Sequence, residues 1–329
     1  MSNFSKYLFV CLVISLFVSY GLPTQAAKLH SIIVVDVDDV GIGSGPDRDK
    51  MENFVKNVAR HAQLTLVRPK VVNLKGNLVN GIIQSRRGTG SEVVKEAITS
   101  TSYQIASDDV VIFYYSGHGL ASKVHGEKWP QLAVAGRNTK SNQFIEMTWI
   151  HKTLWEANPK LLFVIVDACN NELDSSLGGG KEKPRRLLPS AYKTLFTEYQ
   201  GYLLASSSQR GEYSVGNDVL GGVFTRAFFE ELNIQLGHSN PSWETIIKNL
   251  DGKPIGELSD DQHPQLDGNH LRRAGNVPIQ IITPPSSDSF TQPQSSLTCL
   301  DGEKAYYTRA KDRKRCCFID GGNGEEYCN

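Results

Sequence analysis

The chain has 329 residues, of which 40% are hydrophobic and 21% charged, a composition typical of folded globular proteins rather than of disordered or fibrous chains. Its 35 basic and 35 acidic residues cancel, and no stretch interleaves aromatic with basic residues. Composition and charge therefore disfavour nucleic acid and an anionic membrane surface as partners.

The first residues have the pattern of a secretory signal peptide. Lys6 precedes the apolar run 7–17, and the stretch 23–26 (PTQA) supplies a turn and a small-residue cleavage signature that ends at Ala26. The alternative is an uncleaved membrane anchor, but the apolar run is short for a span and no basic stop-transfer segment follows it. We therefore exclude residues 1–26 from the fold and expect a secreted or periplasmic protein with no membrane attachment after cleavage.

Apolar strand patterns alternate with helical patterns along the rest of the chain as far as residue 282. Such strands, buried on both faces and separated by helices, form parallel sheets covered on both sides. We expect an α/β domain over residues 28–282, a three-layer sandwich whose mostly parallel central sheet has about six strands. The predicted strands are 31–37, 64–67, 110–115, 161–166 and 201–205, and the predicted helices are 46–62, 91–100, 148–156, 222–232 and 243–249.

A linker and a small tail follow this domain. Residues 283–296 (TPPSSDSFTQPQSS) are rich in proline and serine, which predicts a linker. Residues 297–329 are too few to form a core without cross-links. We expect a small disulfide-bonded tail.

The six cysteines are distributed unevenly. Four lie in the tail, where an exported protein would form disulfides with one of three connectivities. A bond between the adjacent Cys316 and Cys317 would be strained, so each is expected to pair with Cys299 or Cys328. Cys11 leaves with the signal peptide, and Cys169 remains as a free thiol.

A histidine and this cysteine follow two consecutive predicted strands. His118 comes just after strand 110–115, between two glycines that allow a sharp turn, and Cys169 comes just after strand 161–166. Because the carboxyl ends of parallel strands meet at one edge of a sheet, we expect the imidazole and the thiol to lie side by side.

This pair of side chains suits nucleophilic catalysis. A thiol with an ordinary pKa near ~8.5 is mostly protonated at neutral pH, and an imidazole can hold the thiolate or pass a proton to a leaving amine. The backbone amides of Gly119 and Cys169 could stabilise the negative charge on an attacked carbonyl, each such donor being worth about 3 kcal/mol of barrier. The alternative is that Cys169 is only a small buried residue and that His118 caps a turn.

The motifs YYSGHG (114–119) and VDACNN (166–171) resemble the caspase-like superfamily of clan CD cysteine peptidases, in particular metacaspases and bacterial caspase-domain proteins. GGVFTRAFFEEL (221–232) and QHPQLDGN (262–269) also resemble the later parts of those domains, so the resemblance covers most of residues 28–282. It implies a caspase-like fold, with His118 as general acid and base, Cys169 as nucleophile and Gly119 as oxyanion donor.

The resemblance also implies a pocket for the residue before the scissile bond. Ser116 and Asp167, two places before the histidine and the cysteine, would line it, with a further acid from the first helix, for which Asp47 fits better than its rival Asp49. Two carboxylates would select Lys or Arg, whereas caspases themselves use arginines and cut after Asp. The structural alternatives are that Asp167 satisfies backbone donors and that Asp47 belongs to a helix N-terminus.

The sequence departs from the family pattern in places. Asn170 and Asn171 follow the cysteine in place of the usual His-Ser-Gly or Arg-Gly, and VDVDDVGIG (35–43) differs from the usual first strand. The calcium activation of many metacaspases has only weak candidates here, Asp174 and neighbouring loop acids, and no histidines have metal-ligand spacing. We expect no metal site and no cofactor.

Residues 171–190 predict a long loop with three glycines and a basic cluster, Lys181–Arg186. A peptidase selective for basic residues could cut itself there after Arg185 or Arg186, while Pro184 would hinder a cut after Lys183. Otherwise the cluster is a solvated loop.

The sequence therefore predicts an exported cysteine endopeptidase that cleaves protein or peptide substrates after Lys or Arg through a thioester acyl-enzyme. One alternative is an inactive caspase-like domain used for binding, with the tail as an interaction module of undefined partner. Another is a transpeptidase that uses the same acyl-enzyme.

Overall fold

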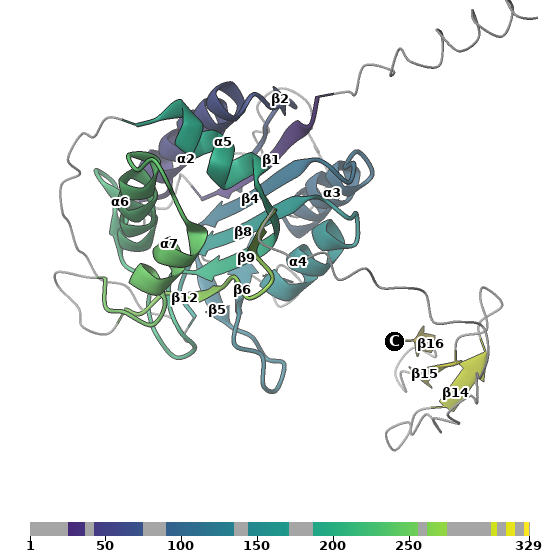
Figure 1. Ribbon diagram of the computed structural model, residues 1–329. Coiled ribbons are helices and arrows are strands. Elements are labelled where there is room, and N and C mark those ends of the chain that lie inside the picture. The colour runs from purple at the N-terminus through teal and green to yellow at the C-terminus, as the bar shows by residue number, and fades with distance from the viewer. Residues whose placement is uncertain are drawn as a thin grey trace, which may run out of the picture. The chain divides into compact units, whose positions relative to one another are not determined.

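The computed structural model in Figure 1 describes residues 26–36, 43–74, 90–134, 144–170, 187–255 and 262–274 and three strands of the tail. The chain divides into two compact units, with the boundary between Pro278 and Ile279. Several sequence predictions fall outside the described residues: the signal peptide up to residue 25, the linker 283–296, Cys11, Cys299, Asn171, Asp174, Arg185 and Arg186.

The first unit is built on an eight-stranded sheet in which β1, β4, β8 and β9 run parallel side by side. Strands β2 and β3 both pair in parallel with β1 at one edge, and β12 and β13 both pair antiparallel with β9 at the other. The bounds are β1 Lys28–Val35, β2 Thr65–Leu66, β3 Lys70–Asn73, β4 Val110–Ser116, β8 Leu161–Asp167, β9 Tyr199–Ser206, β12 Gln265–Asp267 and β13 Arg272–Arg273.

Helices cover both faces of this sheet (Figure 1). Helices α2, α5, α6 and α7 pack on one face and α3 and α4 on the other, each set with its own apolar core. Their bounds are α2 Ser44–Ala62, α3 Gly90–Ser102, α4 Met147–Trp155, α5 Pro189–Thr197, α6 Val223–Leu236 and α7 Trp243–Leu250. The predicted α/β sandwich with a mostly parallel sheet is therefore confirmed.

Successive side chains of a strand point to opposite faces of the sheet, which explains why there are two apolar cores. On β4, Ile112 and Tyr114 face the core under α2, while Phe113 and Tyr115 face the core under α3 and α4. Because every residue of β4 and of β8 is buried, these strands read as unbroken apolar runs rather than as alternating ones.

A buried hydrogen bond between His30 and Asp109 lies at the amino-terminal ends of the central strands. His30 Nε2 lies 2.9 Å from Asp109 Oδ2, and both side chains are only 2% exposed. Asp109 also accepts hydrogen bonds from the amides of Lys28 (2.7 Å) and Ala106 (2.9 Å). Burial raises the pKa of Asp109, but these two amides and His30 outweigh it and leave the pKa lowered.

The structure adds short elements that the sequence pattern did not predict. They are β3, helix α5, the antiparallel edge of the main sheet, a three-stranded antiparallel sheet and a hairpin whose two strands have two residues each. The predicted loop 171–190 is too long at its carboxyl end, because helix α5 already begins at Pro189. Proline is well suited to the first position of a helix. The added sheet consists of β5 Gly119–Ala121, β6 Pro130–Ala133 and β7 Phe144–Glu146, and the hairpin of β10 Gly216–Asn217 and β11 Gly221–Gly222.

The second unit contains a three-stranded antiparallel sheet of β14 (Lys304–Tyr307), β15 (Lys314–Ile319) and β16 (Glu326–Cys328). In its register Cys317 lies opposite Cys328. Within the part of the chain that the structure describes, none of the helices combines the length and apolar character needed to cross a bilayer.

Candidate active site

Two neighbouring strand ends bring the histidine and cysteine segments together. Ser116 and Asp167, the last residues of β4 and β8, are register partners, and the Gly117 amide donates to the Asp167 carbonyl at 3.1 Å. His118 and Cys169 each lie two residues beyond this pair of partners.

Gly119 packs directly against the cysteine backbone. A Cβ at Gly119 would lie 2.4 Å from the carbonyl oxygen of Cys169 and 2.7 Å from the Ala168 Cβ, so no larger residue fits without a shift. The Tyr115 hydroxyl lies 2.6 Å from the carbonyl oxygen of His118, which also accepts from the Ala133 amide at 2.9 Å. The turn that carries His118 is therefore fixed on both sides.

Cys169 is partly buried, and its sulfur is held by one residue of the segment after β9. The Ser214 amide donates to Sγ at 3.3 Å, and Sγ lies 3.6 Å from the Ser214 carbonyl oxygen. Burial raises the pKa of the Cys169 thiol; the Ser214 amide opposes this rise and the Asp167 charge adds to it. The net effect is a raised pKa, which disfavours the thiolate form of Cys169.

Asn170 ties the nucleophile to its surroundings. The Asn170 amide donates to the Glu212 carbonyl at 3.0 Å, and the Gly211 amide donates to the Asn170 carbonyl at 2.8 Å. The Asn170 side chain is fully buried and donates to the Lys128 carbonyl at 2.8 Å. The residue that departs from the family pattern therefore braces two loops around Cys169.

Asp47, Asp167 and Ser116, predicted to share a pocket, lie together in the structure. Asp47, in the first turn of α2, is 0% exposed and accepts from the Gly222 amide (3.0 Å to each carboxylate oxygen) and from Ser116 Oγ (2.9 Å). The rival Asp49 lies apart from them, with a side chain that is 65% exposed and paired with Arg48 at 2.8 Å.

Asp167 is 4% exposed and caps the start of α6 from a distant strand. It accepts from the Thr225 amide (3.0 Å), the Thr225 hydroxyl (2.6 Å) and the Ser214 hydroxyl (2.6 Å). The structural role considered for Asp167, satisfying backbone donors, is therefore present as well. The partial positive charge at a helix N-terminus also stabilises a carboxylate in this position.

The two carboxyl groups are electrostatically coupled. Burial raises the pKa of Asp47 to about 7, with the Asp167 charge adding to the effect and the Gly222 amide and Ser116 hydroxyl opposing it. Burial also raises the pKa of Asp167, against the hydrogen bonds from Ser214 and Thr225. Two buried acids this close repel each other when both are charged.

Four residues of the site had no role predicted from the sequence. Besides Ser214, Gly222 and Thr225, the buried Gln262 donates from Nε2 to the Ser207 carbonyl at 3.1 Å and accepts from the Val215 amide at 3.2 Å. One indication of them is present in the sequence: Gly222, Thr225 and Gln262 belong to the stretches 221–232 and 262–269, which resemble the later parts of caspase-like domains. Among the described residues, no three Cys, His, Asp or Glu side chains gather as a metal-binding group.

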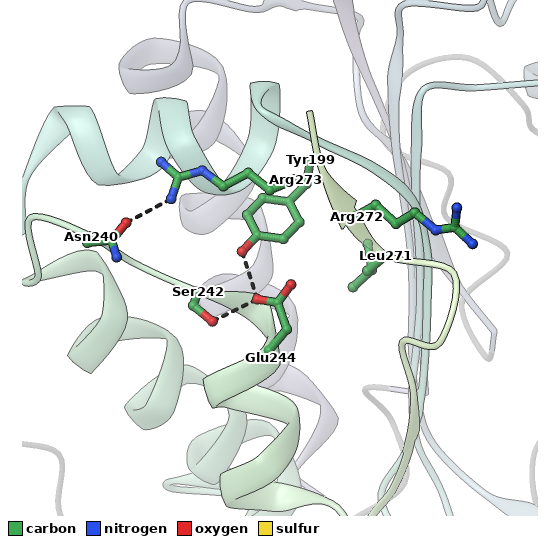
Figure 2. A pocket seen from close by; sticks show the side chains of 7 residues that line it. All are labelled: Tyr199, Asn240, Ser242, Glu244, Leu271, Arg272 and Arg273. Atoms are coloured by element: carbon green, nitrogen blue, oxygen red, sulfur yellow. Dashed lines mark hydrogen bonds between the residues drawn. The ribbon is translucent and has the colours of Figure 1, made fainter. Parts of the chain in front are cut away.

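A separate cavity of about 400 Å³ lies at the amino-terminal end of β9, away from the acids (Figure 2). Glu244 there accepts from the Tyr199 and Ser242 hydroxyls, both at 2.7 Å, and Arg273 donates to Glu198 at 2.8 Å. These polar groups satisfy one another, and we assign the cavity no part in the chemistry.

The chain is similar to known proteins at the level of a family model and of solved structures. A family model of the caspase domain matches residues 42–274. None of the curated proteins matches the chain. Among solved structures, the crystal structure of caspase-1 from Spodoptera frugiperda is similar, with 17% sequence identity, coverage of 74% of this chain and 87% of that chain, and a TM-score of 0.41.

Proposed function

The chain belongs to the caspase-domain family of cysteine peptidases, and from that premise we propose that it is an exported endopeptidase that cleaves proteins or peptides after Lys or Arg. The observation that carries the proposal is the buried pair of carboxylates, Asp47 and Asp167. Asp167 lies two residues before Cys169 in the sequence. The signal-peptide pattern expected in the sequence of residues 1–26 supports a secreted or periplasmic location.

Charge complementarity supports the choice of substrate. A guanidinium or ammonium group that enters between Asp47 and Asp167 would replace the repulsion of two buried acids by two charge-assisted hydrogen bonds. A substrate with Asp at this position would add a third negative charge. The pocket therefore disfavours the specificity of the caspases that cut after Asp.

In the proposed mechanism, His118 takes the thiol proton of Cys169 as the sulfur attacks the scissile carbonyl carbon. The negative charge that develops on the carbonyl oxygen would be stabilised by the backbone amides of Gly119 and Cys169. His118 then gives the proton to the leaving amine, the C–N bond breaks and a thioester remains. Water, activated by His118, hydrolyses the thioester and restores the thiol.

A second candidate is a binding domain without peptidase activity. The contact of Ser214 with the Cys169 sulfur favours it, because the Ser214 backbone lies against the nucleophile. A transpeptidase would use the same acyl-enzyme and differ only in the amine that resolves it. In the binding domain the tail would serve as an interaction module.

The test is a fluorogenic peptide panel with Arg, Lys, Asp or Asn at the cleaved position, assayed with and without calcium. We expect turnover of the Arg and Lys peptides by the wild type and none by Cys169→Ala. Turnover confined to Asp would contradict the pocket assignment, and no turnover of any peptide would favour the binding domain. Mass spectrometry of the same two proteins tests self-processing, since only the wild type should be cut after Arg185 or Arg186.

A further inference from the structure

Gly222, at the junction of β11 and α6, lies between the two acids. A Cβ at Gly222 would lie 2.0 Å from Asp167 Oδ2 and 3.1 Å from Asp47 Oδ2. The first distance is far below any real carbon–oxygen contact, and the second is tight. A side chain at position 222 would therefore occupy the space in which the two carboxyl groups converge.

The backbone conformation does not require glycine at this position. Gly222 has φ −64° and ψ 143°, an extended conformation that any residue adopts. Its neighbour Gly221 differs, because it has φ +88°, in the left-handed region that favours glycine. Glycine is therefore required at position 222 by the lack of room beside the two carboxyl groups, and not by the backbone conformation.

The Gly222 amide also orients one of the acids. It donates to both carboxylate oxygens of Asp47 at 3.0 Å. The hairpin that presents this amide is held in place by Lys50, whose Nζ donates to the Leu220 carbonyl at 2.8 Å, and by the Val223 amide, which donates to the Val215 carbonyl at 2.8 Å. One residue therefore fixes Asp47 and leaves room for Asp167.

We infer that Gly222 is a specificity-determining residue, because it allows both carboxylates to face a single cationic side chain of the substrate. This inference rests on the proposed preference for Lys or Arg. A methyl group at position 222 would displace the Asp167 carboxylate from the Thr225 and Ser214 hydroxyls, so that a substrate cation would meet one acid instead of two.

The test compares Gly222→Ala with the matched control Gly45→Ala. Gly45 lies in the same first turn of α2 as Asp47, but a Cβ there has nothing within 4 Å. We expect Gly222→Ala to lower kcat/KM for Arg and Lys peptides at least tenfold, mainly through KM, and Gly45→Ala to leave it within threefold of wild type.

A second readout separates the pocket from the nucleophile. Agmatine, a small guanidinium compound, should protect wild-type Cys169 from alkylation by iodoacetamide. In Gly222→Ala, protection should need at least ten times more agmatine, while the alkylation rate without agmatine should stay within threefold. If Gly222→Ala melts well below wild type, adding Asp167→Ala should restore the melting temperature, because it removes the carboxylate that the methyl group displaces.

The outcomes are distinguishable. A wild type that prefers Arg and Lys, together with a Gly222→Ala variant that keeps both its kcat/KM and its agmatine protection, contradicts the inference alone. A wild type that cleaves no Arg or Lys peptide contradicts the proposed function and this inference with it. An unfolded Gly222→Ala variant that Asp167→Ala does not rescue also contradicts the inference, because the clash would then lie elsewhere.

Discussion

The backbone of Ser214 lies against the sulfur of Cys169, with the amide 3.3 Å and the carbonyl oxygen 3.6 Å from Sγ. Residues 211 and 212, just before Ser214, are hydrogen-bonded to the residue after the nucleophile: the Asn170 amide donates to Glu212 and the Asn170 carbonyl accepts from Gly211. A substrate that reaches the sulfur must therefore displace or join this segment.

The first prediction concerns alkylation of Cys169 in the empty protein. Because burial raises the pKa of this thiol, the rate of reaction with iodoacetamide should be low at mildly acidic pH and rise continuously up to pH 9. Mass spectrometry of the labelled residue measures it, with Cys169→Ala as the unlabelled control. A fast rate that is already constant at pH 6 would instead indicate a preformed thiolate.

The second prediction tests His118 as the proton carrier. His118→Ala should lower kcat on an Arg peptide by about 10²–10⁴-fold, the usual contribution of a general acid and base. His263, which lies 2.9 Å from Glu212, provides a control, and His263→Ala should retain far more activity. Equal losses in the two variants would contradict the role of His118.

The third prediction follows from the acid pair. The pKa of Asp47 is raised from 3.8 to about 7, so between those pH values the folded protein binds a proton that the unfolded chain has released. Stability is therefore lost as the pH rises through this window. Asp47→Asn should remove this loss and melt higher than wild type at pH 8, while the exposed Asp49→Asn should not.

The same substitution separates stability from catalysis. Asp47→Asn should reduce kcat/KM for basic peptides even though it stabilises the fold, because the substrate cation loses one of its two carboxylates. In the wild type, KM for basic peptides should rise as the pH falls below about 7 and Asp47 takes up a proton. A lower melting temperature for Asp47→Asn at pH 8 would show that the acid stabilises the empty protein.

The fourth prediction concerns the buried hydrogen bond between His30 and Asp109, at the opposite ends of the strands. Replacing Asp109 by Ala leaves His30 and the amides of Lys28 and Ala106 without their buried acceptor, which should lower the free energy of unfolding by about 3–5 kcal/mol. Urea unfolding measures this loss. The folded fraction should keep wild-type kcat/KM, and a change in kcat/KM would indicate that the two ends of the strands are coupled.

The fifth prediction concerns the tail. Opposite residues of an antiparallel pair have Cα atoms about 4.5–5.5 Å apart, within the range that a disulfide spans. The register therefore predicts a Cys317–Cys328 bond, which leaves Cys299 to pair with Cys316. Mass spectrometry of peptides from the unreduced, exported protein distinguishes this pattern from Cys316–Cys328 with Cys299–Cys317.

The sequence predicts well the sheet and the adjacent strand ends that precede His118 and Cys169, because unbroken apolar runs identify buried parallel strands whose carboxyl ends share an edge. It predicts much less of the acid pocket. Asp47 bonds to Gly222, 175 residues away, and this contact depends on how α2 and the β10–β11 hairpin pack. Strands of two or three residues, such as β5 and β10, are too short to show a periodicity.

The parallel pairing of β8 with β9 has a consequence for any cut after Arg185 or Arg186, since both residues lie between these strands in the sequence. One fragment would keep His118, Asp167 and Cys169, and the other would keep Ser214, Gly222 and Thr225. Neither fragment would contain a whole pocket, and the interstrand ladder, the apolar contacts around it and hydrogen bonds such as that of Gly222 to Asp47 would hold the two together. Once such a protein has been denatured, recovery of activity should become a second-order process that depends on protein concentration, unlike that of the intact chain.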